Sequence, residues 1–334
     1  MVSVSYSYKE ITFYSGVFMK RSLSSLFCIL FFLAMLFFPE SVFKGTQNGL
    51  LLWVRAILPS LFPFLIAAEL LLHTKGLFYL IQVTSPILCS FFHVSPYGSF
   101  VVLTGFLCGY PLGAKLTAEL LKKGQISLAE AQYLLSFTNN ASPAFIMNYI
   151  SWNILGLPGQ KYVLFFLLIL SPILCSFLFR RKPVLDAAYC THGCTLSVFA
   201  VSADRAEPSG LLNRCITEST QTILQIGGYV VLFSILCELL FLTGLQNHFT
   251  GTLAISLLEI TNGAVLLWKN HSALRLICIL SAVSFGGVCS IFQVQDVLKG
   301  TPLKIRPYII EKLVTALVTS LLAFFYTLVF PVTG

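Results

Sequence analysis

Charge is scarce in this chain. Only 10% of its 334 residues are charged, whereas 57% are hydrophobic and 14% are aromatic. Soluble domains carry about 25% charged residues, so this composition excludes an ordinary soluble domain and predicts an all-α, polytopic membrane protein. A membrane-spanning helix needs roughly 20 mostly apolar residues. We therefore expect about eight to ten membrane segments and no separate soluble domain.

The chain also lacks the short motifs of common enzymes. No GxSxG, HExxH, Walker or dinucleotide-binding pattern occurs, and no nucleophile and base pair stands out. Cys190, His192 and Cys194 lie close together, but no second ligand pair at zinc spacing accompanies them. We therefore expect no enzyme activity, no metal site and no cofactor.

Basic residues are few and come in short clusters between apolar runs, although the net charge is +8. The main clusters are Lys20–Arg21, Lys122–Lys123 and Arg180–Lys182. Such clusters are typical of cytoplasmic loops that set membrane topology. They predict a lipid bilayer as the environment and no nucleic acid as a partner. The ten cysteines lie mostly in apolar segments such as FCIL, which predicts no disulfide framework.

Apolar runs predict ten membrane segments, five of which contain helix-breaking or polar residues. The interrupted segments contain Pro86, CGYPLGAK, TNNASP, EITNG and SFGGVCS, and we expect them to be broken or re-entrant helices. The ten segments are about 22–38, 49–72, 77–93, 97–121, 128–150, 161–179, 219–242, 249–268, 273–298 and 308–330.

The segments fall into two halves around a polar linker. We divide the chain into a tail with the first transmembrane helix (1–45), a first repeat (46–179), the linker (180–213) and a second repeat (214–334). FLIAAELL, with Glu69, and FSILCELL, with Glu238, agree at five of eight positions. We therefore predict two pseudo-symmetric halves, related as the inverted repeats of many transporters are.

Orientation follows from the charge clusters. If the N-terminus is cytoplasmic, Lys122, Lys123 and the linker fall inside, as the charge rule requires. Lys299, Lys304 and Arg306 then fall outside, against that rule. Either one segment is miscounted or one is re-entrant.

Irregular backbone at membrane depth is tolerated only against protein or a wet cavity, so the interruptions are expected to face each other. A half-helix that resumes at Pro111 offers free N–H groups and a positive dipole end to an anion. Lys115, one turn on, adds a positive charge. The alternative is that the glycines serve only tight helix packing.

The interruptions supply the predicted binding residues. Amide and hydroxyl side chains there either bind a substrate or bond across helices. The substrate-binding candidates are Gly109, Tyr110, Pro111, Gly113, Lys115, Thr138, Asn139, Asn140, Ser142, Thr261, Asn262, Gly263, Gly286, Gly287 and Gln293. Buried carboxylates are expensive in a membrane and mark functional sites, so the candidates for a coupling ion are Glu259, Glu69, Glu238 and Asp296, with Glu259 the best placed.

Several of these segments resemble one family. GFLCGYPLGAKLTAELLKKGQISLAEAQYLLSFTNNASPAFI resembles the signature stretch of the YlbJ-type sporulation integral membrane proteins. LLWVRAILPSLFPFLIAAELL, LLEITNGAVLL and SFGGVCSIFQVQ resemble their other recurring segments, so the likeness covers about residues 46–330. TNNASPAF differs from the small or glycine-rich turn expected there. The family is grouped with the nucleoside-recognition or Gate domain membrane proteins.

The resemblance implies a secondary-transporter-like fold and a role in sporulation. For the sporulation members it implies transport of dipicolinic acid, a small planar dianion, across the outer forespore membrane of the mother cell. It makes a small anionic substrate and other sporulation membrane proteins the expected partners, together with a homo-oligomer. The alternatives are a transporter of a nucleoside or another metabolite, a non-transporting scaffold for spore-envelope assembly, and an intramembrane enzyme.

Overall fold

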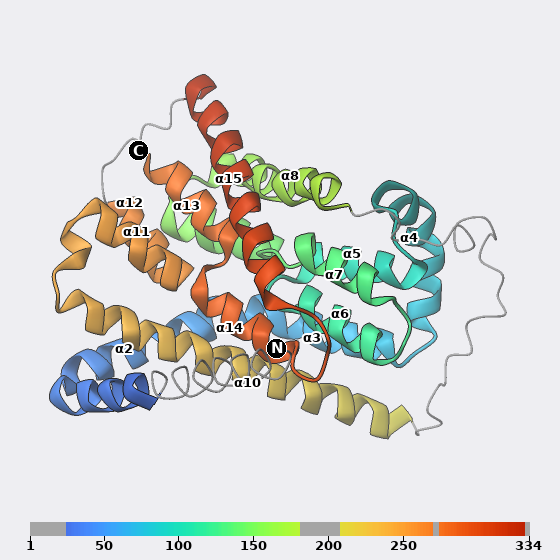
Figure 1. Cartoon of the computed structure of the whole chain (residues 1–334), viewed down its shortest axis with the longest axis horizontal. Coiled ribbons are helices and arrows are strands. Elements are labelled where there is room, and N and C mark those ends of the chain that lie inside the picture. Colours follow the sequence, from blue (N-terminus) through green and yellow to red (C-terminus); the bar gives the residue numbers. More distant parts are fainter. Residues whose placement is uncertain (1–24, 181–207, 270–273, 331–334) are drawn as a thin grey trace, which may run out of the picture.

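The structure is a computed structural model that describes residues 25–180, 208–269 and 274–330. These ranges contain helices and turns but no strand (Figure 1), so the predicted all-α class is confirmed. In chain order the helices are Ser25–Phe37, α2 (Pro39–Leu52), η1 (Trp53–Ile57), α3 (Leu58–Leu72), α4 (Gly76–Phe92), α5 (Pro96–Cys108), α6 (Leu112–Lys122), α7 (Leu128–Phe137), η2 (Phe145–Ile154), η3 (Pro158–Gln160), α8 (Lys161–Phe179), α10 (Pro208–Phe241), η5 (Leu245–Asn247), α11 (Phe249–Leu258), α12 (Ile260–Lys269), α13 (Arg275–Phe285), α14 (Gly287–Val297) and α15 (Ile305–Val329).

The chain is a multi-pass membrane protein. Among the described residues, five helical stretches are long and apolar enough to cross a membrane, or six if α4 and α5, which meet at 90°, form one bent span. The five are Pro39–Leu72, Pro158–Phe179, Gly210–Phe241, Arg275–Val297 and Ile305–Val329. The number is below the predicted eight to ten because several predicted segments are pairs of short helices.

The first such pair, α5 and α6, is a hairpin with its tip at residues 109–111. Gly105, one turn before the tip, and Gly113, one turn after it, both pack on the carbonyl oxygen of Thr138. A Cβ built on them would lie 2.2 Å and 2.4 Å from that oxygen, respectively. Two helices that reach the same atom from either side of a break run antiparallel. The predicted segment 97–121 is therefore re-entrant.

The second pair, α11 and α12, is also a hairpin. Its tip is Glu259, whose backbone is extended between the two helices. A Cβ built on Gly263 would lie 2.1 Å from the Cα of Ser256, so α12 turns back along α11. The two hairpins lie on either side of α13, α14 and α15 (Figure 1).

Two further helices are interrupted. α7 ends at Phe137, and the chain resumes as the π-helix η2 after an irregular stretch at residues 138–142. α13 and α14 meet at Gly286, whose φ of 90° is accessible to glycine at little cost. This second interruption is mild, because Arg275–Val297 still qualifies as one apolar stretch.

The predicted break at Pro86 is wrong. α4 is continuous from Gly76 to Phe92, with Pro86 inside it. A proline removes one backbone hydrogen bond from a helix, and here the helix continues past it. The chain bends instead at residues 93–95, where His93 has a left-handed backbone with a φ of 57°.

The basic turn after α6 and the loop before α15 lie at the same end of the molecule. The Lys304 N–H donates to Gln132 Oε1 at 3.2 Å, and Gln132 Nε2 donates to the Lys304 carbonyl at 3.4 Å. A Cβ built on Gly300 would lie 3.8 Å from Lys122 Nζ. Lys299, Lys304 and Arg306 therefore lie on the same side as Lys122, which agrees with the alternative that one of the predicted segments is re-entrant.

Two of the ten predicted segments, 97–121 and 249–268, are hairpins, which return to the side from which they enter. One of them, α11 and α12, lies between the two basic loops and adds no crossing between them. Lys299, Lys304 and Arg306 then share a side with Lys122 and Lys123, as the positive-inside rule favours for basic clusters.

Each half contains a hairpin, then an interrupted helix, then a long helix: α5 and α6, α7 and η2, and α8 in the first, and α11 and α12, α13 and α14, and α15 in the second. The inverted-repeat relation itself stays a prediction. The predicted tail before residue 25, most of the linker, and the Cys190, His192 and Cys194 cluster lie outside the described residues.

Candidate functional site

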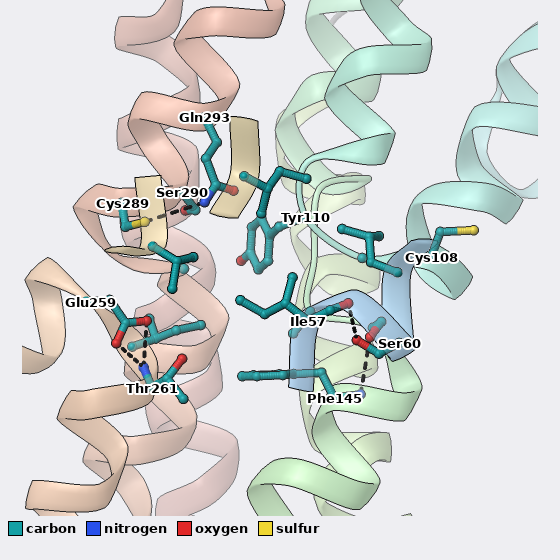
Figure 2. Close-up of a pocket in the computed structure, with 18 residues that line it drawn as sticks. Ile57, Ser60, Cys108, Tyr110, Phe145, Glu259, Thr261, Cys289, Ser290 and Gln293 are labelled. Carbon is teal, nitrogen blue, oxygen red and sulfur yellow. Dashed lines mark hydrogen bonds between the residues drawn. The ribbon is translucent and has the colours of Figure 1, made fainter. Parts of the chain in front are cut away.

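All four interruptions meet at one cavity. The empty space in and in front of this cavity is about 590 Å³, which includes open solvent at its mouth. Figure 2 shows residues of the second half on one wall and residues of α3, η2 and the α5–α6 hairpin on the other. The lining residues are Ile57, Ser60, Leu61, Cys108, Gly109, Tyr110, Ala141, Ser142, Phe145, Ile226, Val230, Glu259, Ile260, Thr261, Gly286, Cys289, Ser290 and Gln293.

Glu259 is the one acidic residue of this lining, which contains no lysine or arginine. Its side chain is 3% exposed. The carboxylate accepts the backbone N–H of Thr261 at 3.0 Å and that of Asn262 at 2.7 Å, so it caps the N-terminus of α12 (Figure 2). The end of α12 that would attract an anion is thus already occupied by a carboxylate of the protein.

Tyr110, at the tip of the first hairpin, projects into the middle of the cavity (Figure 2). Its hydroxyl donates to the Ser284 carbonyl at 3.0 Å, which ties the first half to α13. A Cβ on Gly286 would lie 2.8 Å from the tyrosine ring, so the missing side chain at Gly286 makes room for it. The peptide bond between Tyr110 and Pro111 is cis.

The stretch between α7 and η2 lies directly against the first hairpin. Besides the contacts of Thr138, Ser142 packs on Gly109, where a Cβ would lie 2.8 Å from the serine Cβ. The Asn139 amide donates to the Tyr308 hydroxyl at 2.8 Å, and the Asn140 amide donates to the Phe137 carbonyl at 2.7 Å. These polar side chains therefore fasten the interruption to its neighbours and hold the cavity wall in place.

Seven of the predicted site residues line the cavity: Gly109, Tyr110, Ser142, Glu259, Thr261, Gly286 and Gln293. A second group lies at the interruptions but outside the lining: Pro111, Gly113, Thr138, Asn139, Asn140, Asn262, Gly263 and Gly287. The prediction that the interruptions converge on one hollow is confirmed by this geometry. The binding roles of the individual residues stay predictions.

Lys115 and Glu69 lie outside the lining and pair with each other. Both are largely buried, with side chains 13% and 1% exposed. The Lys115 ammonium also donates to the Thr222 hydroxyl at 3.0 Å, which joins α6 to α10. The positive charge of Lys115, which the sequence predicted would attract the substrate, is therefore already neutralised by Glu69.

The other two carboxylates chosen from the sequence also lie away from the cavity. Glu238 pairs with Lys44 at 3.1 Å and accepts the Asn48 amide at 2.9 Å, so it links α10 to α2. Asp296 pairs with Lys299 at the end of α14. Neither carboxylate lines the cavity, and a coupling role for each stays a prediction.

The sequence reasoning missed several residues at or beside the site. Phe145, Cys108, Cys289 and Ser290 line the cavity, and their proximity to the glycine and TNNASP motifs was the available signal. Lys312 was also missed, because it lies within a stretch with the charge pattern of an amphipathic helix. Its side chain is 2% exposed and lies directly behind Tyr110.

Comparison with known proteins supports the sporulation assignment. The chain is 28% identical over 311 residues to the sporulation integral membrane protein YlbJ of Bacillus subtilis (strain 168). The alignment covers 82% of this chain and 75% of that protein. The resemblance to YlbJ-type proteins is therefore confirmed. No protein-family profile matches the chain, and the link to the Gate domain proteins stays a prediction. No solved structure matches it.

Proposed function

We propose that this protein is a secondary-transporter-like membrane protein that moves a small anionic metabolite, dipicolinic acid in the first place, across the outer forespore membrane. The observation that carries the proposal is the convergence of two hairpin tips and two interrupted helices on one cavity. Discontinuous helices that meet inside the bilayer form the substrate sites of many transporters.

The charge of the lining suggests how transport is coupled. An anion beside an ionised Glu259 would be repelled at short range in a medium of low dielectric constant. The anion therefore enters when Glu259 carries a proton, and the protein works as a proton-coupled carrier. A cavity with one carboxylate and no basic residue in its lining fits this scheme better than passive anion flow.

A dipicolinate-like substrate also fits the shape and polarity of the site. The walls are mostly apolar, with an aromatic ring at Tyr110 and another at Phe145 (Figure 2). Aromatic side chains stack favourably on planar rings. The hydroxyl groups of Ser60, Thr261 and Ser290 offer polar contacts. A nucleoside shares the planar ring but not the charge, and it is the comparison substrate for the test.

The test is uptake by the purified full chain in liposomes. Labelled dipicolinate and a labelled nucleoside are supplied separately, each with and without an inward proton gradient or a sodium gradient. We expect dipicolinate uptake that a proton gradient accelerates. Protein-free liposomes give the leak rate.

Two outcomes contradict the proposal. Nucleoside uptake without dipicolinate uptake would replace the substrate class. Uptake of neither compound, under every gradient, by correctly inserted protein would favour the scaffold, in which the interruptions serve only helix packing. A scaffold is also expected to lose function when residues 180–213 are replaced, whereas the carrier is expected to retain uptake.

A further inference from the structure

A buried lysine lies behind the cavity wall. Lys312 is on α15, its side chain is 2% exposed, and its ammonium lies 5.0 Å from the centre of the Tyr110 ring. Tyr110 itself lines the cavity. A lysine at membrane depth therefore lies against one of the residues that line the proposed substrate space.

The ammonium of Lys312 has only part of its bonding capacity filled. It donates one hydrogen bond, to the Asn139 carbonyl at 3.0 Å, and an ammonium has three protons to donate. Among the described residues, no ion pair within 4.0 Å includes Lys312; those found involve other lysines and an arginine. A buried charge without a counter-ion is costly, and such groups inside a membrane are usually functional.

A second group beside Lys312 is also incompletely bonded. The Asn139 side chain is 1% exposed, and its Oδ1 atom is buried without a hydrogen-bond partner. Its Nδ2 donates to the Tyr308 hydroxyl, which fixes the direction of the amide. A buried acceptor without a donor costs free energy that a ligand can recover. Lys312 and Asn139 therefore present an incompletely bonded amino group and a free acceptor from neighbouring elements, α15 and the α7–η2 interruption.

We propose that Lys312, Asn139 and Tyr110 form a carboxylate-binding subsite that joins the cavity when the Tyr110 ring turns aside. The ligand class is a small dicarboxylic acid bound as its monoanion, such as hydrogen dipicolinate, which has one carboxylate and one protonated acid group. The carboxylate pairs with the Lys312 ammonium, and the donor bonds to Asn139 Oδ1. This inference rests on the proposed function, because it assumes that the cargo is an anion, and it assigns the residue that recognises its charge.

Tyr110 is the movable part of this arrangement. One hydrogen bond to the Ser284 carbonyl and the space left by Gly286 hold its ring in place. Turning the ring aside breaks this hydrogen bond, which contributes about 0.5–1.5 kcal/mol, and the contact between the ring and the Lys312 ammonium. Lys312 itself sits on the long helix α15, so only the tyrosine ring has to move.

The test measures binding of a charged and an uncharged ligand to the purified full chain. The ligands are dipicolinate and its neutral diamide, which have the same pyridine ring but differ in charge. We expect wild-type protein to bind dipicolinate at least about tenfold more tightly than the diamide, a difference of about 1.4 kcal/mol. Lys312→Met is expected to remove this preference while it leaves diamide binding unchanged, and Lys312→Arg is expected to keep most of it. Lys123→Met, on the exposed turn after α6, is the matched control.

Protection in the native chain gives a second measurement that needs no variant. Dipicolinate is expected to slow the modification of Lys312 by a small amine-reactive reagent, measured by peptide mass spectrometry. The diamide is expected to leave this rate unchanged. If wild-type protein takes up and prefers dipicolinate, but Lys312→Met keeps the preference or Lys312 stays unprotected, the subsite is wrong and the proposed function stands. If wild-type protein neither binds nor transports dipicolinate, both are wrong.

Discussion

At the scale of single residues, the proposed proton coupling depends on the carboxylate at the tip of the second hairpin. Glu259 caps α12 through two backbone N–H groups and also lines the cavity. A glutamine at this position keeps one oxygen to accept those bonds but cannot exchange a proton. A glutamine at this position therefore tests the proposed proton coupling while it keeps the cap of α12.

We expect Glu259→Gln to make dipicolinate uptake insensitive to the proton gradient. In wild-type protein an inward gradient of one pH unit, worth about 1.4 kcal/mol or a factor of about ten, is expected to raise uptake severalfold. The measurement is initial uptake in liposomes at two external pH values. Glu40→Gln, on the exposed first turn of α2, is the control. Gradient-driven uptake by Glu259→Gln at the wild-type rate would remove Glu259 from the coupling step.

The sequence predicted individual residues well where backbone chemistry dictates position. Glycine, proline and asparagine clusters marked three of the four interruptions, and Glu259 marked the other, because these residues disfavour a continuous helix. The sequence did not predict which buried charged residues pair with each other. Lys115 and Glu69 are 46 positions apart, and no local pattern shows that they neutralise each other. It failed for Lys312 for the same reason, since its neighbours come from distant helices.

At the scale of elements, the long helix α10 packs on the continuous helix formed by α2, η1 and α3. The Trp53 indole N–H donates to the Ile223 carbonyl at 3.1 Å, and the indole ring covers Gly227. A Cβ on Gly227 would lie 2.7 Å from the ring, whereas nothing lies within 4 Å of a Cβ on Gly228. Two adjacent glycines thus differ sharply in how they contribute to helix packing.

We expect Gly227→Ala to lower the apparent melting temperature in detergent, because overpacking a close contact costs about 1–3 kcal/mol. Gly228→Ala, the matched control, is expected to be neutral or slightly stabilising, since alanine favours helix by about 1 kcal/mol over glycine. The intrinsic fluorescence of Trp53 should shift only in Gly227→Ala. Equal melting temperatures for the two variants would contradict the packing described for this pair of helices.

The length of the elements was the part least accessible from sequence. The apolar runs at 97–121 and 249–268 each have the length of a crossing, but both are hairpins of two short helices. Hydropathy measures apolar length and not direction, so a hairpin and a crossing give the same signal. Pro86 misled in the opposite sense, because α4 tolerates a proline in its interior.

At the scale of the whole molecule, the hairpins decide which loops share a side. The turn after α6 meets the loop before α15 through the paired Gln132 and Lys304. The α13–α14 stretch, Arg275–Val297, is long enough to cross the membrane from that loop. Lys269, at the end of α12 and near the start of α13, therefore lies on the opposite side.

We expect Lys123→Cys and Lys299→Cys to react with a membrane-impermeant maleimide from one side and Lys269→Cys from the other. The measurement is labelling above the wild-type background in vesicles of known orientation. Labelling of Lys123→Cys and Lys299→Cys from opposite sides would contradict the hairpin assignment. The sequence left this arrangement open, because it did not show which of the interrupted segments is re-entrant.

Two cysteine thiols, Cys108 and Cys289, line the cavity and can report when it is open to a reagent. They belong to the first hairpin and to α14, one in each half, and both are free and buried. We expect a small alkylating reagent to reach these thiols only when the cavity is open to the side of the membrane on which the reagent is supplied. For the proposed carrier, the ratio of their alkylation rates from the two faces of the bilayer would report how much of the time the cavity is open to each face.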